Sequence, residues 1–257
     1  MSDQPPHTPP LAAQNDPWGE LKSFTAARIA LGHAGSGLPT AAHLRFQLAH
    51  ARARDAVHTP LDTAALAATF AAEGWPTLCV ASAAADRMTY LTRPDLGRQL
   101  SQSAIDTLSE PATAPDVALV VADGLSSTAV TANALHFMRA LIPMLTAAKR
   151  SVSPLIIATQ SRVALGDHIG ALLQAKLTLI AIGERPGLSA ADSLGVYITW
   201  KPERCRIESE RNCISNIRSG GLPPDQAAAQ SAALIDSMFR YRSSGVGLSA
   251  RLALPVA

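Results

Sequence analysis

Aromatic residues are scarce in this 257-residue sequence, where Phe, Trp and Tyr together fill 4% of the positions. The hydrophobic share is nevertheless 47%, and most of it is Ala, Leu, Val and Ile. A chain of this length and composition can bury the core of one large α/β domain, with or without an accessory segment. A core built from small side chains also suits close contact between helices and a sheet.

Cysteine is scarcer still. Cys79, Cys205 and Cys213 are odd in number and form no CxxC pair, which argues against a disulfide framework and against a structural zinc site. Reduced thiols in a cytoplasmic protein are the simpler interpretation. We therefore predict no metal site on this chain.

A strong net charge and long apolar runs are both missing. The formal charge is +2 and no long basic run is present, so nucleic acid is not expected as a partner. No apolar run reaches the roughly eighteen residues that a membrane helix requires. The N-terminal MSDQPPHTPP is polar and proline-rich, unlike a secretory signal. The sequence predicts a soluble protein without a membrane partner.

Three segments differ in their patterns. Residues 1–17 contain five prolines and little to bury, which predicts a disordered tail. Residues 18–74 predict an N-terminal helical segment, with a helix that begins near Thr40 and places Leu44, Leu48 and Ala51 on one face. In residues 75–257 short apolar runs alternate with helical patterns.

That alternation predicts an α/β fold, a Rossmann-like, doubly wound and mostly parallel sheet. The predicted strands are TLCVAS, DVALVVADG, PLIIAT, LTLIAIG and SLGVYITW, with a further short strand at RCRIES, residues 204–209. The predicted helices cover residues 93–108, 126–145, 167–175 and 223–244.

Ligands of such sheets bind beyond the carboxyl ends of the strands. Asp123-Gly124, Arg162-Val163 and the turn from Glu184 to Gly187 all occupy that kind of position. The residues alone therefore favour a ligand site at this edge. They do not favour a dinucleotide, because no GxGxxG follows a strand.

Cys213, in ERNCISNIRSGG, has three open interpretations: a nucleophile, a metal ligand or a wall of a binding site. A catalytic thiol needs a base or cations that lower its pKa, and no His lies within forty residues of Cys213. Asp167-His168 is a fragment of the D-x-H-x-x-G signature of corrinoid proteins with the wrong spacing. We interpret His168 as the first turn of a helix capped by Asp167, and not as a cobalt ligand.

Four segments occur together in a recognisable order: YLTRPDLGRQL, VVADGLSSTAV, GERPGLSAADSLGVYITW and ERNCISNIRSGGLPPDQAAA. They resemble the small subunit of ethanolamine ammonia-lyase, over roughly residues 40–248. The resemblance implies a cobalamin-binding domain over residues 75–257. It also implies a hetero-oligomer with equal numbers of small subunits and large TIM-barrel subunits, located in the cytoplasm or inside a bacterial microcompartment.

In that family the large subunit holds the substrate pocket, and the small subunit covers the lower side of base-on adenosylcobalamin. The complex converts ethanolamine to acetaldehyde and ammonia by a radical mechanism. The resemblance assigns cofactor contacts to Val163, Glu184 and Cys213 and no catalytic residue to this chain. Cys213 then becomes a wall residue. Arg162, Arg185, Arg211 and Asn216 are secondary candidates for contacts with the cofactor or the large subunit.

Two other hypotheses remain. The chain could be a free-standing α/β enzyme that uses Cys213 or Asp123 directly. It could also be a non-catalytic ligand-binding scaffold whose Arg- and His-rich helix, residues 43–58, docks a partner. Activity that depends on a second chain would distinguish the subunit from a free-standing enzyme. Activity that depends on cobalamin would distinguish it from a non-catalytic scaffold.

Overall fold

The computed structural model describes residues 18–25, 27–108 and 113–253. Internal contacts divide the chain into two compact units, residues 1–52 and 53–257. The boundary falls inside helix α1, Thr40–His58. In the described ranges no helix is both long and apolar enough to cross a bilayer. The predicted tail, residues 1–17, lies outside the described residues.

The first unit is built from little regular structure before α1. A 3-10 turn, η1, covers Gly19–Ser23, and an isolated bridge joins Ala34 to Gly37. Helix α1 then begins at Thr40, as the sequence predicts. The predicted shared face of α1 is exposed, since Leu44 is 57% and Leu48 is 52% accessible.

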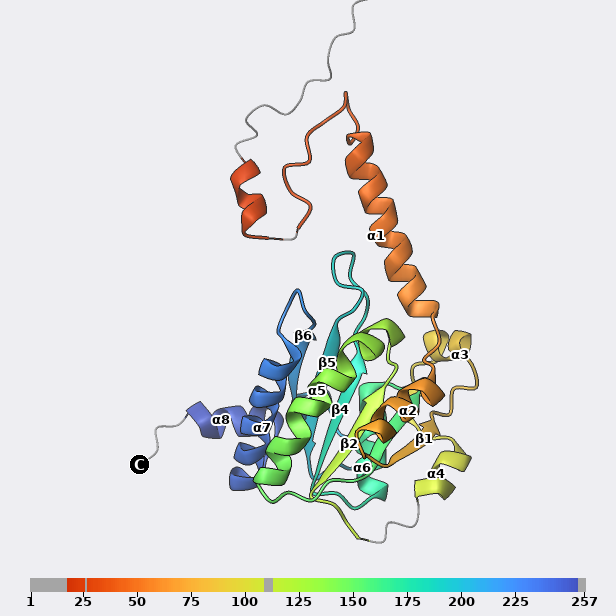
Figure 1. Cartoon of the computed structure of the whole chain (residues 1–257), viewed down its shortest axis with the longest axis vertical. Coiled ribbons are helices and arrows are strands. Elements are labelled where there is room, and N and C mark those ends of the chain that lie inside the picture. The colour runs from red at the N-terminus through yellow and green to blue at the C-terminus, as the bar shows by residue number, and fades with distance from the viewer. Residues whose placement is uncertain (1–17, 26, 109–112, 254–257) are drawn as a thin grey trace, which may run out of the picture. The chain divides into compact units, whose positions relative to one another are not determined.

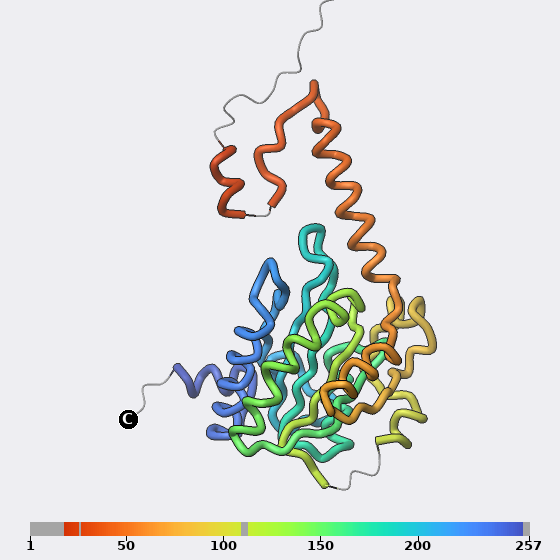
Figure 2. The backbone as a smooth tube through the Cα atoms, in the orientation of Figure 1, coloured from red at the N-terminus to blue at the C-terminus, as the bar shows by residue number. Residues whose placement is uncertain are grey.

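The second unit contains one sheet of six strands among the described residues, in the order β1-β3-β2-β4-β5-β6 (Figures 1 and 2). Strands β1 to β4 run parallel to one another, whereas β5 and β6 are antiparallel additions at one edge. The predicted α/β, mostly parallel sheet is confirmed. The strands are β1 Thr77–Ala81, β2 Val117–Ala122, β3 Leu155–Thr159, β4 Leu177–Gly183, β5 Leu194–Trp200 and β6 Arg211–Ile217.

Helices cover both faces of this sheet, and each face has its own apolar cluster. Helices α2 (Thr63–Ala72), α5 (Ser127–Ala147) and α7 (Pro224–Tyr241) pack on one face; Figure 1 shows α5 and α7 in front of the strands. Helices α4 (Gln102–Leu108) and α6 (Val163–Leu172) pack on the other. Every residue of β2 and β4 is buried, which explains why these strands are unbroken apolar runs in the sequence.

The single helix predicted over residues 93–108 is wrong. The chain forms α3 (Arg87–Thr92), the 3-10 turn η2 (Leu96–Arg98) and then α4. Tertiary contacts override the helical pattern here. Leu100 bridges Ser82 and donates its N–H to His168 Nδ1 at 3.3 Å, and a Cβ on Gly97 would lie 2.9 Å from Arg162 Cγ.

The strand predicted at residues 204–209 is also wrong. Cys205 has a φ of +72°, which suits a turn and not a strand. A 3-10 turn, η3, covers Glu208–Glu210, and the strand is β6, which follows it. The sequence conceals β6 because a bulge opposite β5 separates its inward-facing Ile214 and Ile217 by three residues instead of two.

Other boundaries differ more modestly. Helix α6 begins at Val163, four residues before its predicted start at Asp167, and α5 continues through Pro143 to Ala147. The segment after α7, for which no helix is predicted, forms a further helix, α8, over Gly245–Ala253. Ser126 Oγ accepts the Ala129 N–H at the start of α5.

Candidate functional site

An open cavity of about 370 Å³ lies where the carboxyl ends of β2, β3 and β4 meet. Parallel strands bring their following loops to the same edge, so segments far apart in the sequence line one depression. The three strand-end positions singled out in the sequence all contribute to it. The lining residues are Tyr90, Gly124, Leu125, Arg162, Val163, Ile182, Gly183, Glu184, Arg185 and Tyr197.

Two glycines let the loops after β2 and β4 approach each other at the floor of this cavity. Gly124 has a φ of +55°, and a Cβ there would lie 2.1 Å from the Gly183 carbonyl oxygen. The N–H of Leu125 donates to that same oxygen at 2.9 Å. A side chain at Gly124 would therefore separate the two strand ends.

Asp123 is an anchor beneath the cavity. Its carboxylate accepts the N–H groups of Gln160 and Ser161 at 2.9 and 3.0 Å, and Arg87 contacts it at 3.3 Å. Asp123 is only 3% exposed, and burial raises the pKa of its carboxyl. Because protein donors already occupy both of its oxygens, the arrangement disfavours the alternative in which Asp123 acts on a substrate.

Arg87 extends this anchor to neighbouring segments. Its guanidinium donates to the carbonyl oxygens of Gly124 at 2.9 Å and Val57 at 2.7 Å, and it stacks over the Tyr90 ring at 4.7 Å. Burial raises the pKa of Tyr90 to about 12, so its hydroxyl stays protonated and donates to the Ser161 carbonyl oxygen at 3.0 Å. Tyr90 is thereby fixed as one wall of the cavity.

Glu184 follows β4 directly and is held by two donors. Ser193 Oγ donates to its Oε2 at 2.5 Å, and the Asn216 N–H donates to the same oxygen at 3.3 Å. Asn216 adopts a φ of +59° at this point. The two contacts link the turn after β4 to the start of β5 and the end of β6, and they orient the carboxylate at the cavity.

Cys213 lies on β6 directly opposite Tyr197 of β5, which lines the cavity. Val163 and Glu184 therefore share the cavity itself, whereas Cys213 is adjacent to it through Tyr197. Desolvation raises the pKa of the Cys213 thiol, a hydrogen bond with Tyr197 partly offsets the rise, and the Glu184 carboxylate adds to it. A thiol that stays protonated is a poor nucleophile, which fits a wall residue better than a catalytic one.

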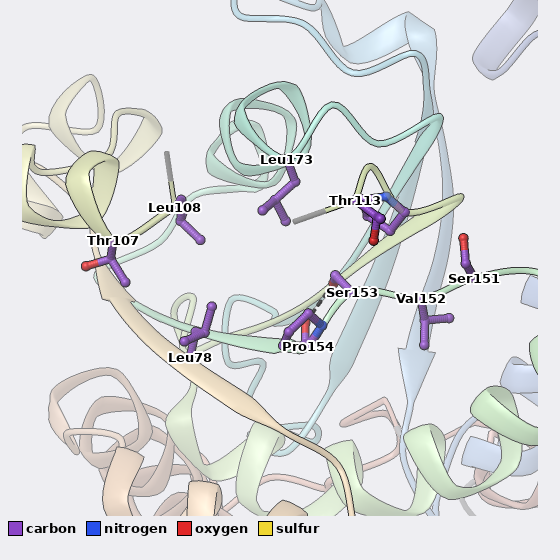
Figure 3. Close-up of a pocket in the computed structure, with 10 residues that line it drawn as sticks. Leu78, Thr107, Leu108, Thr113, Ser151, Val152, Ser153, Pro154 and Leu173 are labelled. Atoms are coloured by element: carbon purple, nitrogen blue, oxygen red, sulfur yellow. Dashed lines mark hydrogen bonds between the residues drawn. The ribbon is translucent and has the colours of Figure 1, made fainter. Parts of the chain in front are cut away.

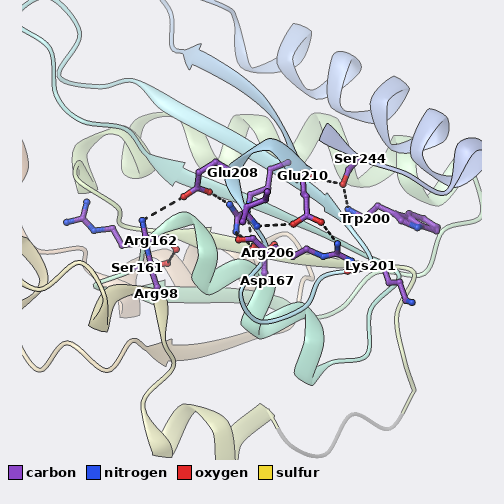
Figure 4. Close-up of polar contacts among 12 residues, drawn as sticks. Arg98, Ser161, Arg162, Asp167, Trp200, Lys201, Arg206, Glu208, Glu210 and Ser244 are labelled. Atoms are coloured by element: carbon purple, nitrogen blue, oxygen red, sulfur yellow. Dashed lines mark hydrogen bonds and ion pairs between the residues drawn. The ribbon is translucent and has the colours of Figure 1, made fainter. Parts of the chain in front are cut away.

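Arg211 and Asp167 form a buried ion pair, each side chain being 3% exposed. Arg211 Nε and Nη2 donate to Asp167 Oδ2 at 2.8 and 2.5 Å, and Glu208 also contacts the guanidinium. Figure 4 shows this network around Asp167. The prediction that Asp167 caps a helix is wrong, because it lies inside α6 and fastens that helix to β6. Arg211 is engaged in this contact and not at the cavity.

A second cavity, of about 270 Å³, lies at the amino ends of the strands (Figure 3). Leu78, Leu108 and Leu173 line it together with small polar residues and prolines. None of its described lining residues is charged, so it offers less chemistry than the carboxyl edge. Among the described residues no group of three or more His, Cys, Asp or Glu side chains could hold a metal ion.

Sequence reasoning missed Tyr90 and Tyr197 as residues of the site. Tyr90 comes from α3, a helix that the pattern did not predict, and Tyr197 lies within an apolar run that resembles any core strand. A missed element therefore concealed a site residue.

Comparisons with known proteins agree with one another. The family model for the ethanolamine ammonia-lyase light chain (EutC) matches residues 15–249. A Pseudomonas aeruginosa protein described as ethanolamine ammonia-lyase small subunit is 48% identical over 252 residues, which cover 96% of this chain and 91% of that protein. A protein of the same description from Pseudomonas fluorescens is 49% identical over 93% of this chain and 89% of its own length. Another, from Azotobacter vinelandii, is 48% identical over 96% of this chain and 91% of its own length.

Proposed function

Because the chain belongs to the ethanolamine ammonia-lyase light-chain family, we propose that it is the small subunit of an adenosylcobalamin-dependent ethanolamine ammonia-lyase. In this proposal the chain covers the lower side of the base-on cofactor. The observation that supports it most is the convergence of Val163, Glu184 and Cys213, from three separate elements, at one open edge of the sheet.

The residues at this edge fit the chemistry of a corrinoid. Val163 and Tyr197 offer apolar surface, Glu184 offers a hydrogen-bond acceptor and the guanidinium groups of Arg162 and Arg185 offer donors. A corrin has an apolar ring edge with amide side chains, which require both kinds of partner. The cavity volume of about 370 Å³ is near the lower limit of roughly 300–1,000 Å³ for small-molecule sites. It can therefore enclose one portion of the cofactor and leave the rest to a second chain.

Each of the three residues has a distinct task. Val163 presents its side chain to the flat nucleotide base or the corrin edge. Glu184 has its Oε2 occupied by Ser193 and Asn216, which leaves Oε1 to accept a hydrogen bond from a corrin amide or a ribose hydroxyl. Cys213 is small and protonated, so it packs beside the ligand without reacting.

When bound, the cofactor supplies radical chemistry through homolysis of its cobalt–carbon bond. This chain contributes position and electrostatics, and it needs no catalytic group of its own. The large subunit, a TIM barrel present in equal number, holds the substrate pocket. The complex resides in the cytoplasm or inside a bacterial microcompartment.

The test is ammonia release from ethanolamine in the presence of adenosylcobalamin. Three samples are compared: this chain alone, the cognate large subunit alone and the two together. Activity that requires both chains and cobalamin supports the proposal. Activity of this chain alone would instead support a free-standing enzyme, and an inactive mixture of two folded chains would contradict the proposal.

A further inference from the structure

Two cationic side chains line the cavity without an anionic partner. Arg162 and Arg185 are both lining residues, and neither forms an ion pair with a carboxylate among the described residues. The nearby Arg87 differs, because it is paired with Asp123. Glu184 is the one acidic residue among the described residues that line the cavity.

Arg162 is held in place although it lacks a counter-ion. Its guanidinium stacks over the Tyr90 ring at 4.3 Å, and its Nη2 donates to the Tyr90 carbonyl oxygen at 3.1 Å. Its stem passes Gly97, where any side chain would collide with Arg162 Cγ. The Nε atom is buried and has no hydrogen-bond partner. A buried donor without a partner is costly, so the protein leaves the hydrogen-bonding capacity of this guanidinium incompletely satisfied.

The backbone around Arg162 favours an anion as well. Arg162 is the N-cap residue of the ten-residue helix α6 and makes no side-chain hydrogen bond to the first turn. The N–H groups of that turn and the positive end of the helix dipole therefore add to the charge of the guanidinium. Helix starts of this kind bind phosphate groups when a cation is also present.

We propose that Arg162, together with the first turn of α6, binds the phosphodiester of the cofactor's nucleotide arm. This inference rests on the proposed function. The peripheral side chains of the corrin end in neutral amides, whereas the nucleotide arm carries the phosphodiester anion. A guanidinium pairs with phosphate through two parallel hydrogen bonds. The carboxylate of Glu184 repels an anion, so the phosphodiester lies on the Arg162 side of the cavity and the amides or ribose lie near Glu184.

The experiment measures corrinoid binding to the assembled complex of both subunits by equilibrium dialysis and absorbance. Cyanocobalamin carries the nucleotide arm, and dicyanocobinamide lacks it. We expect Arg162→Gln to raise the Kd of cyanocobalamin by about 10- to 100-fold, the range for a lost hydrogen-bonded charge pair, and to leave the Kd of dicyanocobinamide within about twofold of wild type. Arg162→Lys keeps the charge but loses the bidentate hydrogen bonding. Its Kd for cyanocobalamin should therefore lie between those of wild type and Arg162→Gln.

Arg240→Gln is the matched control. Arg240 also lies over a tyrosine ring, Tyr241 at 5.3 Å, but it is an exposed residue of α7 outside the cavity. Its loss should not change either Kd. If Arg162→Gln weakens both corrinoids equally, or neither, the phosphodiester assignment is overturned while the proposed function stands. If the wild-type complex binds no cyanocobalamin, the proposed function itself fails.

A phosphorus NMR measurement covers the case in which Arg162→Gln does not assemble. The phosphodiester resonance of cyanocobalamin should shift on binding to the wild-type complex, and that shift should be smaller in Arg162→Lys. An identical shift in both complexes would contradict the proposal.

Discussion

The protonation state of Cys213 distinguishes a residue that only packs beside the ligand from a catalytic nucleophile. It can be measured through the reactivity of the thiol. Because its surroundings raise the pKa of the thiol, the thiolate fraction near neutral pH is smaller than for an ordinary cysteine. We expect iodoacetamide to alkylate Cys213 several-fold more slowly in the folded chain than in the urea-unfolded chain at pH 7.5. The rate should rise as the pH increases above the usual thiol pKa of about 8.5.

Peptide mass spectrometry after timed quenching follows Cys213 separately from Cys79 and Cys205. Steric protection is a weak alternative explanation, since the Cys213 residue is exposed. Faster alkylation in the folded chain would mean a lowered pKa and would revive the nucleophile hypothesis.

The residues that the sequence could locate are those at the ends of buried strands. Gly124, Arg162, Val163 and Glu184 follow unbroken apolar runs, and the geometry of a parallel sheet brings them to one cavity. Their roles toward the cofactor came from the family resemblance and stay predictions. The ion pair between Arg211 and Asp167 could not be predicted, because it joins residues 44 positions apart through an unpredicted strand.

At the scale of the element, the loops after β2 and β4 depend on Gly124. Alanine at this position must adopt a φ of +55° and place its Cβ 2.1 Å from the Gly183 backbone oxygen. Gly74 is a matched control, since its φ is +79° but a Cβ there meets nothing within 4 Å. We expect Gly74→Ala to lower the free energy of unfolding by about 1 kcal/mol, and Gly124→Ala to lower it by about 2 kcal/mol more.

Urea unfolding of both variants, followed by circular dichroism, gives the difference. Because the displaced backbone forms the floor of the cavity, Gly124→Ala should also weaken corrinoid binding by the complex, whereas Gly74→Ala should not. Equal losses of stability in the two variants would show that the strand ends can separate without cost.

Elements were predictable from the sequence where one physical signal dominated. The central strands β2 and β4 are buried on both faces, so their apolar runs mark them clearly. The edge strand β6 has one covered face and a bulge, which removes the two-residue period that identifies a strand. Helices α3 and α4 are short and separated by tertiary contacts of Leu100, which local propensity does not report.

At the scale of the whole molecule, apolar exposure is concentrated in the first unit. Of thirteen exposed large hydrophobic side chains among the described residues, seven lie within residues 18–52. They are Trp18, Leu21, Phe24, Leu38, Leu44, Phe46 and Leu48. Soluble monomers rarely leave such groups uncovered together. A subunit that functions inside a larger complex can do so, because another chain covers the surface after assembly.

This concentration predicts that the chain expressed without its partner self-associates. Leu44 and Leu48 are one helical turn apart on α1 and are more than half exposed, so Leu44→Gln with Leu48→Gln removes adjacent apolar surface without opening a core. We expect this double variant to sediment with a smaller oligomeric fraction than wild type at the same concentration. Val246→Gln is the control, since Val246 is 67% exposed but lies in the second unit, on α8. If Val246→Gln reduces self-association as much as the double variant, general surface hydrophobicity and not the first unit is responsible.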